Sequence, residues 1–172
     1  IKLPAKGKKI GSLVVNPGGP GASGVDYVYG KTDVIAQEVL NRFDLVGFDP
    51  RGVARSAPIS CLSDAELDKS FAGNTKIDSV SLLDSVTKQS KDFADECLKQ
   101  NKYLKYMSTE NAAKDMDILR SALGEPKLNF LGASYGTYLG TLYLNQFPKK
   151  VGKFILDGAI DPTVTGNQQL ID

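Results

Sequence analysis

The chain has 172 residues, a length that suits one domain of ordinary size or part of a larger one. Its 21 basic and 20 acidic side chains leave a formal net charge of +1, which excludes a strong electrostatic attraction to nucleic acid or to an acidic membrane surface. The 41% apolar content argues against disorder, and the apolar runs are far shorter than a membrane span.

The first half of the chain predicts two short strands with a helix between them. Residues Gly11–Asn16 form an apolar run that meets a Pro/Gly cluster, which is typical of a buried strand ending in a loop. Residues Val34–Phe43 carry apolar side chains at helical spacing, with Thr32 or Asp33 as the expected N-cap. Residues Asp44–Phe48 form a second apolar strand, and the start of the chain is compatible with another.

The second half continues this alternation. Residues Ser63–Gln100 are polar and mostly compatible with helix, and Thr109–Leu123 follows the apolar period of an amphipathic helix. A third strand is expected at Leu128–Leu131, a helix at Tyr135–Phe147 and a fourth strand at Val151–Leu156. Short apolar strands that alternate with helices predict an α/β fold with a mostly parallel sheet that is covered on both faces.

The sequence contains no histidine, and this absence restricts the possible chemistry. Histidine is the commonest general base near neutral pH and the commonest metal ligand. A zinc site would need Cys or carboxylate ligands gathered together, and the sequence shows no such cluster, so we predict no metal site. Any mechanism that requires imidazole must receive it from outside these 172 residues.

Residues Gly132–Gly136 match the pattern G-x-S-x-G, with a predicted strand before them and a predicted helix after them. In this context Ser134 is expected on a sharp, strained turn that exposes its hydroxyl and directs the helix N-terminus to the same point. Gly132 and Gly136 are expected where a side chain would collide as strand and helix approach. The alternative is a glycine-rich turn with an idle serine.

A glycine-rich loop at Asn16–Gly24 follows the first strand. A phosphate-binding loop is not favoured, because neither G-x-G-x-x-G nor a Lys-Ser/Thr ending is matched cleanly. The functional interpretation is a loop that stabilises an oxyanion, with a second donor from Tyr135, the residue after the serine. Proline has no N–H, so the candidate loop donors are Gly18, Gly19, Gly21 and Ala22. A rigid surface turn is the alternative.

The segment Phe48–Pro58, at the end of the second predicted strand, contains a charged turn. One interpretation is a loop that lines the floor of an active site. The other is structural, with Asp49 and Arg51 tying loops together by charge-assisted hydrogen bonds. We favour the structural interpretation.

The two cysteines, Cys61 and Cys97, also allow two interpretations. They are either unrelated buried thiols or the two ends of one disulfide, and no CxxC pattern supports a redox or zinc site. A disulfide would place the protein outside the cytosol.

Taken in order, these motifs resemble those of the α/β-hydrolase fold, and more narrowly those of secreted tripeptidyl aminopeptidases and proline iminopeptidase-like serine exopeptidases. The resemblance runs from Gly11 to Pro162, and the segments that carry it are Asn16–Gly21, Asp49–Gly52, Gly132–Tyr138 and Leu156–Pro162. The Asn-Pro-Gly-Gly-Pro-Gly loop and the cysteine pair match the tripeptidyl aminopeptidase branch. Ala54 stands where the family usually has Gly.

The resemblance implies that Ser134 is the nucleophile, that Gly19 and Tyr135 supply the oxyanion hole, and that no cofactor is needed. In the family a helical cap, an Asp and a His follow the fourth strand. The chain is therefore expected to be the N-terminal part of a hydrolase, with residues 1–162 in the core and 163–172 starting the connection to the cap. Asp157 is another candidate for the acid, but its family position favours a structural role at the strand end.

The same resemblance implies a peptide substrate with a free N-terminus and a secreted or cell-envelope location. The site would be completed by the remainder of the same polypeptide, so the isolated chain is expected to be inactive. Two alternatives stay open, a carboxylesterase or lipase on the same scaffold and a non-catalytic binding domain.

Overall fold

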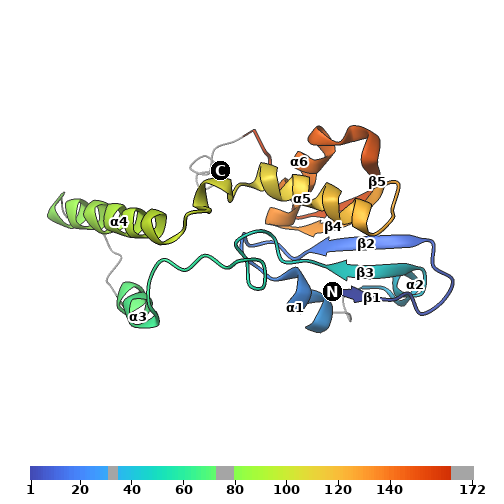
Figure 1. The fold of residues 1–172 in the computed structure, drawn as a ribbon, viewed down its shortest axis with the longest axis horizontal. Coiled ribbons are helices and arrows are strands. Elements are labelled where there is room, and N and C mark those ends of the chain that lie inside the picture. Colours follow the sequence, from blue (N-terminus) through green and yellow to red (C-terminus); the bar gives the residue numbers. More distant parts are fainter. Residues whose placement is uncertain (31–34, 73–79, 164–172) are drawn as a thin grey trace. The chain divides into compact units, whose positions relative to one another are not determined.

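The computed structural model describes residues 1–30, 35–72 and 80–163, and the chain divides into two compact units. The first unit comprises Ile1–Ala57 with Ser108–Asp172 and holds the β-sheet. The second unit is Pro58–Met107 and is helical. Figure 1 labels the helices and strands of both units.

A five-stranded sheet forms the centre of the first unit, in the order β1-β3-β2-β4-β5. Neighbouring strands are parallel, except that the short β1 pairs antiparallel with β3. The expected α/β class with a mostly parallel sheet is therefore confirmed. The strands are β1 (Lys2–Leu3), β2 (Gly11–Asn16), β3 (Phe43–Gly47), β4 (Leu128–Ala133) and β5 (Val151–Asp157).

Four helices accompany the sheet: α1 (Gly24–Gly30), α2 (Gln37–Leu40), α5 (Thr109–Ala122) and α6 (Tyr135–Gln146). Helices α5 and α6 confirm the helices predicted over Thr109–Leu123 and Tyr135–Phe147. Helix α5 begins where Ser108 accepts the N–H of Asn111 through its side chain, at 3.3 Å, as an N-cap does. A 3₁₀ turn over Pro148–Lys150 follows α6.

The predicted helix over residues 34–43 is wrong in extent. Over residues 35–43 the structure has a single helical turn, α2, and Phe43 instead begins β3, where it pairs in parallel with Gly11. Pairing within the sheet therefore overrides the helical spacing of the apolar side chains. Val34 and the expected caps, Thr32 and Asp33, lie outside the described residues. Helix α1 was not predicted, because it is short and has glycine at both ends.

The sheet lies between two apolar clusters. One, packed with α5 and α6, includes the fully buried Phe130 and Tyr143, and the other, packed with α1, includes Val15 and Val28. All residues of β2 are buried, since both faces of this central strand are covered. Strand β2 ends at Asn16, at the carboxyl edge of the sheet, where open α/β sheets bind ligands.

The second unit contains α3 (Asp64–Ala72), α4 (Val80–Gln100) and a 3₁₀ turn over Leu104–Tyr106, as the helix-compatible composition indicated. Helix α3 begins with part of a capping box, because the Glu66 carboxylate accepts the N–H of Ser63 at 2.8 Å and its hydroxyl at 2.6 Å. No residue of α3 is buried, so its apolar side chains contribute little to a core. None of the helices in the described ranges is long and apolar enough to cross a membrane.

A disulfide joins Cys61 to Cys97 and ties the segment before α3 to the last turns of α4. The interpretation of the two cysteines as a bonded pair is therefore confirmed. The side-chain amide of Asn101 donates to the carbonyl oxygens of Ser60 and Cys97, each at 2.9 Å, and so connects the two chain segments on either side of the bond.

Replacing Cys61 and Cys97 together by serine should destabilise the second unit. The bond closes a segment of 36 residues, and the loss of that restriction on the unfolded chain corresponds to about 4 kcal/mol in the chain-entropy estimate. Far-UV circular dichroism during denaturation of both proteins measures the loss of stability. Thiol titration of the denatured parent protein, with and without reductant, tests whether the bond is present. Two reactive thiols in the unreduced parent would contradict the bond.

Candidate active site

Ser134 is the single residue between the end of β4 and the start of α6. Its backbone has φ 52° and ψ −121°, a conformation that costs a residue with a side chain on the order of 1–3 kcal/mol. Ser134 is exposed, and its hydroxyl neither caps α6 nor bonds to any residue in the described ranges. The structure thus presents this hydroxyl on a strained turn, as the sequence predicts.

Two glycines allow strand, turn and helix to meet. A Cβ on Gly132 would lie 2.4 Å from the carbonyl oxygen of Gly136, and a Cβ on Gly136 would lie 2.8 Å from the carbonyl oxygen of Asn16. One turn further along α6, a Cβ on Gly140 would lie 2.8 Å from a methyl carbon of Leu156. The predicted collisions are therefore confirmed, and α6 starts directly against the ends of β2 and β4.

Hydrogen bonds hold the serine turn against the end of β5 and the segment after it. The N–H of Ser134 donates to the carbonyl of Asp157 at 2.8 Å. The N–H and the hydroxyl of Thr137 both donate to the carbonyl of Ser134, at 2.8 and 2.7 Å, and the same hydroxyl accepts the N–H of Ile160 at 2.9 Å. Asp157 thus supports the turn through its main chain, as expected of a residue with a structural role at the strand end.

The role of Thr137 was not recognised from the sequence. The signal available was its place directly after the G-x-S-x-G pattern, on the first turn of α6.

The glycine-rich loop lies against the serine turn. A Cβ on Gly18 would lie 2.7 Å from the carbonyl oxygen of Ala133 and 3.1 Å from Cβ of Ser134. Gly18 also has φ 102°, a value that strongly favours glycine. The structure therefore brings together the two motifs for which the sequence suggested chemistry.

Two of the four candidate loop donors are already used within the loop. The N–H of Gly18 donates to Oδ1 of Asn16 at 3.0 Å, and the N–H of Ala22 donates to the carbonyl of Gly18 at 3.4 Å. In the part of the chain that the structure describes, the N–H groups of Gly19 and Gly21 make no hydrogen bond, and both residues are exposed. The loop donor implied by the resemblance, Gly19, is therefore still available, as is Gly21.

Tyr135 opens α6 and offers the second N–H. As the first residue of the helix, it has no intrahelical acceptor for this group. Its side chain is anchored on α5, where its hydroxyl lies 2.8 Å from Oγ1 of Thr109. Burial raises the pKa of Tyr135, against the smaller effect of this hydrogen bond. The anchored ring thus helps to fix the position of the residue that offers this N–H.

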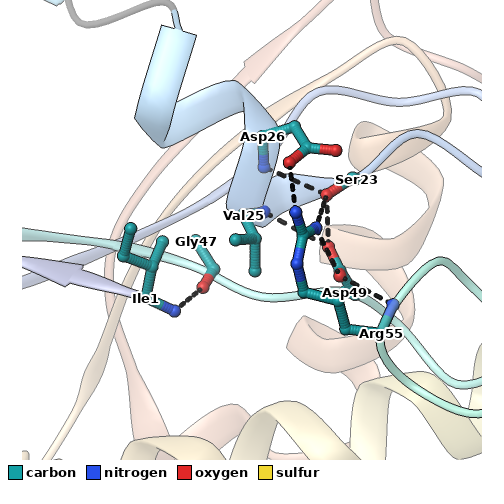
Figure 2. A network of polar contacts seen from close by, with 7 residues as sticks. All are labelled: Ile1, Ser23, Val25, Asp26, Gly47, Asp49 and Arg55. Atoms are coloured by element: carbon teal, nitrogen blue, oxygen red, sulfur yellow. Dashed lines mark hydrogen bonds and ion pairs between the residues drawn. The ribbon is translucent and has the colours of Figure 1, made fainter.

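Figure 2 shows how the loop after β3 holds the end of the glycine-rich loop. The carboxylate of Asp49, whose side chain is 1% exposed, accepts the hydroxyl of Ser23 at 2.5 Å and the N–H of Val25 at 3.3 Å. It also accepts the N–H of Arg55 at 3.1 Å. Burial alone would raise the pKa of Asp49, but the hydrogen bonds from Ser23, Arg55 and Val25 outweigh burial and lower it.

Arg51 ties the same loop to α5. Its Nε and Nη2 donate to the two carboxylate oxygens of Asp115, at 2.8 and 2.6 Å. The structural interpretation of Asp49 and Arg51 is therefore confirmed. Ala54, at the position where the resemblance expects glycine, has φ 40°, in the region that favours glycine.

The chain brings no imidazole to Ser134, since the sequence has no histidine. Within residues 1–30, 35–72 and 80–163, no group of three or more Cys, Asp or Glu side chains is arranged to hold a metal ion.

Residues 11–171 match the profile of a family described as the alpha/beta hydrolase fold. The chain is 47% identical over 169 residues to "Serine protease Hip1" of Mycobacterium tuberculosis, a match that covers 94% of the chain and 32% of that protein. It is 40% identical over 162 residues to "Tripeptidyl aminopeptidase" of Streptomyces lividans, covering 92% of the chain and 30% of the relative. "Carboxylesterase B" of Mycobacterium tuberculosis is 43% identical over 175 residues, a match that covers 99% of the chain and 34% of that protein.

The chain thus spans about a third of the length of these relatives. Among solved structures, "Marine microorganism esterase" matches with a TM-score of 0.50 at 19% identity, covering 91% of the chain and 39% of that structure. At this identity the match supports the fold alone.

Replacing Asp49 by Asn should lower the free energy of unfolding by about 1–3 kcal/mol, because buried hydrogen bonds lose their charged acceptor. The folded protein lowers the pKa of Asp49, so the stability that it contributes is present above about pH 4 and is lost as the pH falls further. Chemical denaturation near neutral pH and near pH 3 should therefore show a gap between wild type and variant that narrows in acid.

Asp26→Asn is the matched control, because Asp26 is an exposed carboxylate that pairs with the same Arg55. It should change the stability by less than about 1 kcal/mol. An Asp49→Asn variant as stable as wild type near neutral pH would contradict the role of this network.

Proposed function

Because the chain belongs to the α/β-hydrolase fold family, we propose that it carries the nucleophile and the oxyanion hole of a serine hydrolase. The observation that carries the proposal is the exposed Ser134 on its positive-φ turn, directly beside Gly18 of the glycine-rich loop. In this proposal Ser134 is the nucleophile, and the N–H groups of Gly19 and Tyr135 are the oxyanion donors. Both groups lack a hydrogen-bond partner among the described residues.

The proposed reaction is acyl transfer in two steps. A histidine from the rest of the protein removes the proton of the Ser134 hydroxyl as its oxygen bonds to the substrate carbonyl carbon. The carbonyl oxygen becomes an oxyanion, which the two N–H groups stabilise, and the loss of one such donor typically costs about 3–4 kcal/mol. As the intermediate collapses, the bond from the carbonyl carbon to the leaving group breaks and the histidine gives the leaving group its proton. Water then hydrolyses the ester bond to Ser134, which releases the acid and restores the serine hydroxyl.

We further propose that the chain is the N-terminal part of a longer hydrolase. Support comes from the relatives, of which it spans about a third, and from the absence of histidine. Residues 1–162 then belong to the catalytic core, and 163–172 start the connection to a cap. The acid and the histidine of the triad come from the remainder of the same polypeptide, so residues 1–172 alone have no base for Ser134.

For the substrate we propose a peptide with a free N-terminus. The support is similarity to proteins named as a serine protease and a tripeptidyl aminopeptidase, at 47% and 40% identity. A carboxylesterase is the second candidate, favoured by the 43% identity to a protein of that name. The same nucleophile and oxyanion donors serve amides and esters, so the rest of the protein decides between them.

We also propose that the protein works outside the cytosol, in the cell envelope or the medium. The disulfide between Cys61 and Cys97 supports this, because such bonds persist in oxidising compartments.

Ser134→Ala in the full-length protein should abolish labelling by a fluorophosphonate probe, because the probe bonds to the activated serine oxygen. Turnover should fall by about 10⁴-fold or more. In-gel fluorescence and peptide mapping of the labelled residue measure this. Ser121→Ala, at an exposed serine on α5, is the control and should label like wild type. A wild-type protein that does not react would favour the non-catalytic binding domain.

The two substrate classes can be separated on the full-length protein. We expect a chromogenic tripeptide amide with a free N-terminus to give a higher kcat/KM than the same peptide with an acetylated N-terminus. For the free peptide and for a short-chain aryl ester, we divide kcat/KM by the rate constant of the uncatalysed hydrolysis. We expect this ratio to be larger for the peptide. Ester hydrolysis without hydrolysis of any tripeptide amide would replace the peptidase proposal by the carboxylesterase.

A further inference from the structure

Asn16 lies at the point where the two halves of the proposed oxyanion hole meet. It is the last residue of β2, is 2% exposed, and pairs in register with Gly132 of β4, two residues before Ser134. A polar side chain buried at this depth needs hydrogen bonds to offset the loss of water. Its contacts therefore show which groups it holds.

The first contact is with the glycine-rich loop. Oδ1 of Asn16 accepts the N–H of Gly18 at 3.0 Å, a bond across two residues that folds the start of the loop back onto the strand end. The N–H of Gly18 is thus used inside the loop, whereas the next residue, Gly19, is exposed and its N–H makes no hydrogen bond in the described part of the chain. The side chain of Asn16 thus removes the Gly18 N–H from the loop donors that a substrate could meet, and leaves those of Gly19 and Gly21.

The second contact is with the first turn of α6. A Cβ on Gly136 would lie 2.8 Å from the carbonyl oxygen of Asn16 and 2.9 Å from its Oδ1. Gly136 follows Tyr135, the proposed second donor, so Asn16 sets the spacing between the loop and the helix start. A larger side chain at position 16 would push the two donors apart.

The remaining polar atom of this side chain is unsatisfied. Nδ2 of Asn16 is the one buried side-chain nitrogen or oxygen in the described part of the chain that has no hydrogen-bond partner. An orphaned buried donor costs about 1–3 kcal/mol, so stability alone does not account for an asparagine here. A role in the site that requires Oδ1 at this point does account for it.

We propose that Asn16 is a positioning residue of the oxyanion hole, which holds the Gly19 and Tyr135 donors at their working separation. The inference rests on the proposed function, because it assigns Asn16 a part in stabilising the same oxyanion. It adds a residue that acts through Gly18 and Gly136.

The test uses two variants of the full-length protein. Asn16→Ala removes Oδ1 and frees the N–H of Gly18, so kcat should fall by about 10- to 100-fold, as expected for donors misplaced by a fraction of an ångström. KM should change by less than about threefold, because the lost interaction acts in the transition state. An Asn16→Ala variant that is folded and keeps wild-type kcat would overturn the proposal.

Asn16→Asp keeps the size of the side chain and the acceptor for Gly18, so it tests the proposal even where the alanine variant does not fold. It places a new buried carboxyl beside the oxyanion donors. Burial raises the pKa of such a group. Once ionised, it opposes the negative charge that develops on the substrate, so kcat/KM should fall as the pH rises through this pKa. Wild type should lack this descending limb.

Asn129→Asp is the matched control. Asn129 is a partly buried asparagine of β4 away from the serine turn, where it donates to the carbonyl of Ser12 at 3.1 Å and accepts the N–H of Lys153 at 3.0 Å. This variant should lose stability and keep the wild-type pH profile. An Asn16→Asp profile of the same shape as wild type would overturn the positioning role.

The outcomes also separate this inference from the proposed function. An active wild-type enzyme with unaffected Asn16 variants contradicts the inference alone. A wild-type protein that neither labels nor turns over contradicts both.

Discussion

Three backbone segments meet at the carboxyl edge of the sheet with no room for a side chain between them. The end of β4, the first turn of α6 and the loop after β2 approach so closely that a Cβ on Gly132, Gly136 or Gly18 would lie between 2.4 and 2.8 Å from a neighbouring carbonyl oxygen. Ser134 lies within this contact on its strained turn, and the loop lies beside it. The rest of the proposed site depends on it.

Much of the architecture could be predicted from the sequence, because short apolar strands between helical segments have few ways to fold. Strand β2 was predicted with its observed bounds, and the turn at Ser134 followed from small residues between a strand and a helix. The helix over 34–43 was wrong, because partners in the sheet, distant in sequence, decide the conformation of Phe43. Local spacing carries no information on such a partner.

The candidate site, too, could be predicted from the sequence only in part. Ser134 and the glycine-rich loop were found from the sequence because each motif is local. The parts that hold them were not, since Asn16 contacts Gly136 and Asp157 holds Ser134 across long stretches of chain. The sequence left four candidate N–H donors in the loop. Hydrogen bonds inside the loop use two of them, so the structure leaves Gly19 and Gly21. Buried polar side chains at loop ends thus fix a geometry that the motifs only suggest.

The most direct test of the central claim is a crystal structure of the full-length protein after reaction with a p-nitrophenyl phosphonate, which leaves a tetrahedral phosphonyl group on the reactive residue. The account predicts a bond from phosphorus to Oγ of Ser134. It also predicts a phosphonyl oxygen about 3 Å from the N–H nitrogens of Gly19 and Tyr135. Phosphorus on another residue, or an oxygen that contacts neither nitrogen, would contradict it.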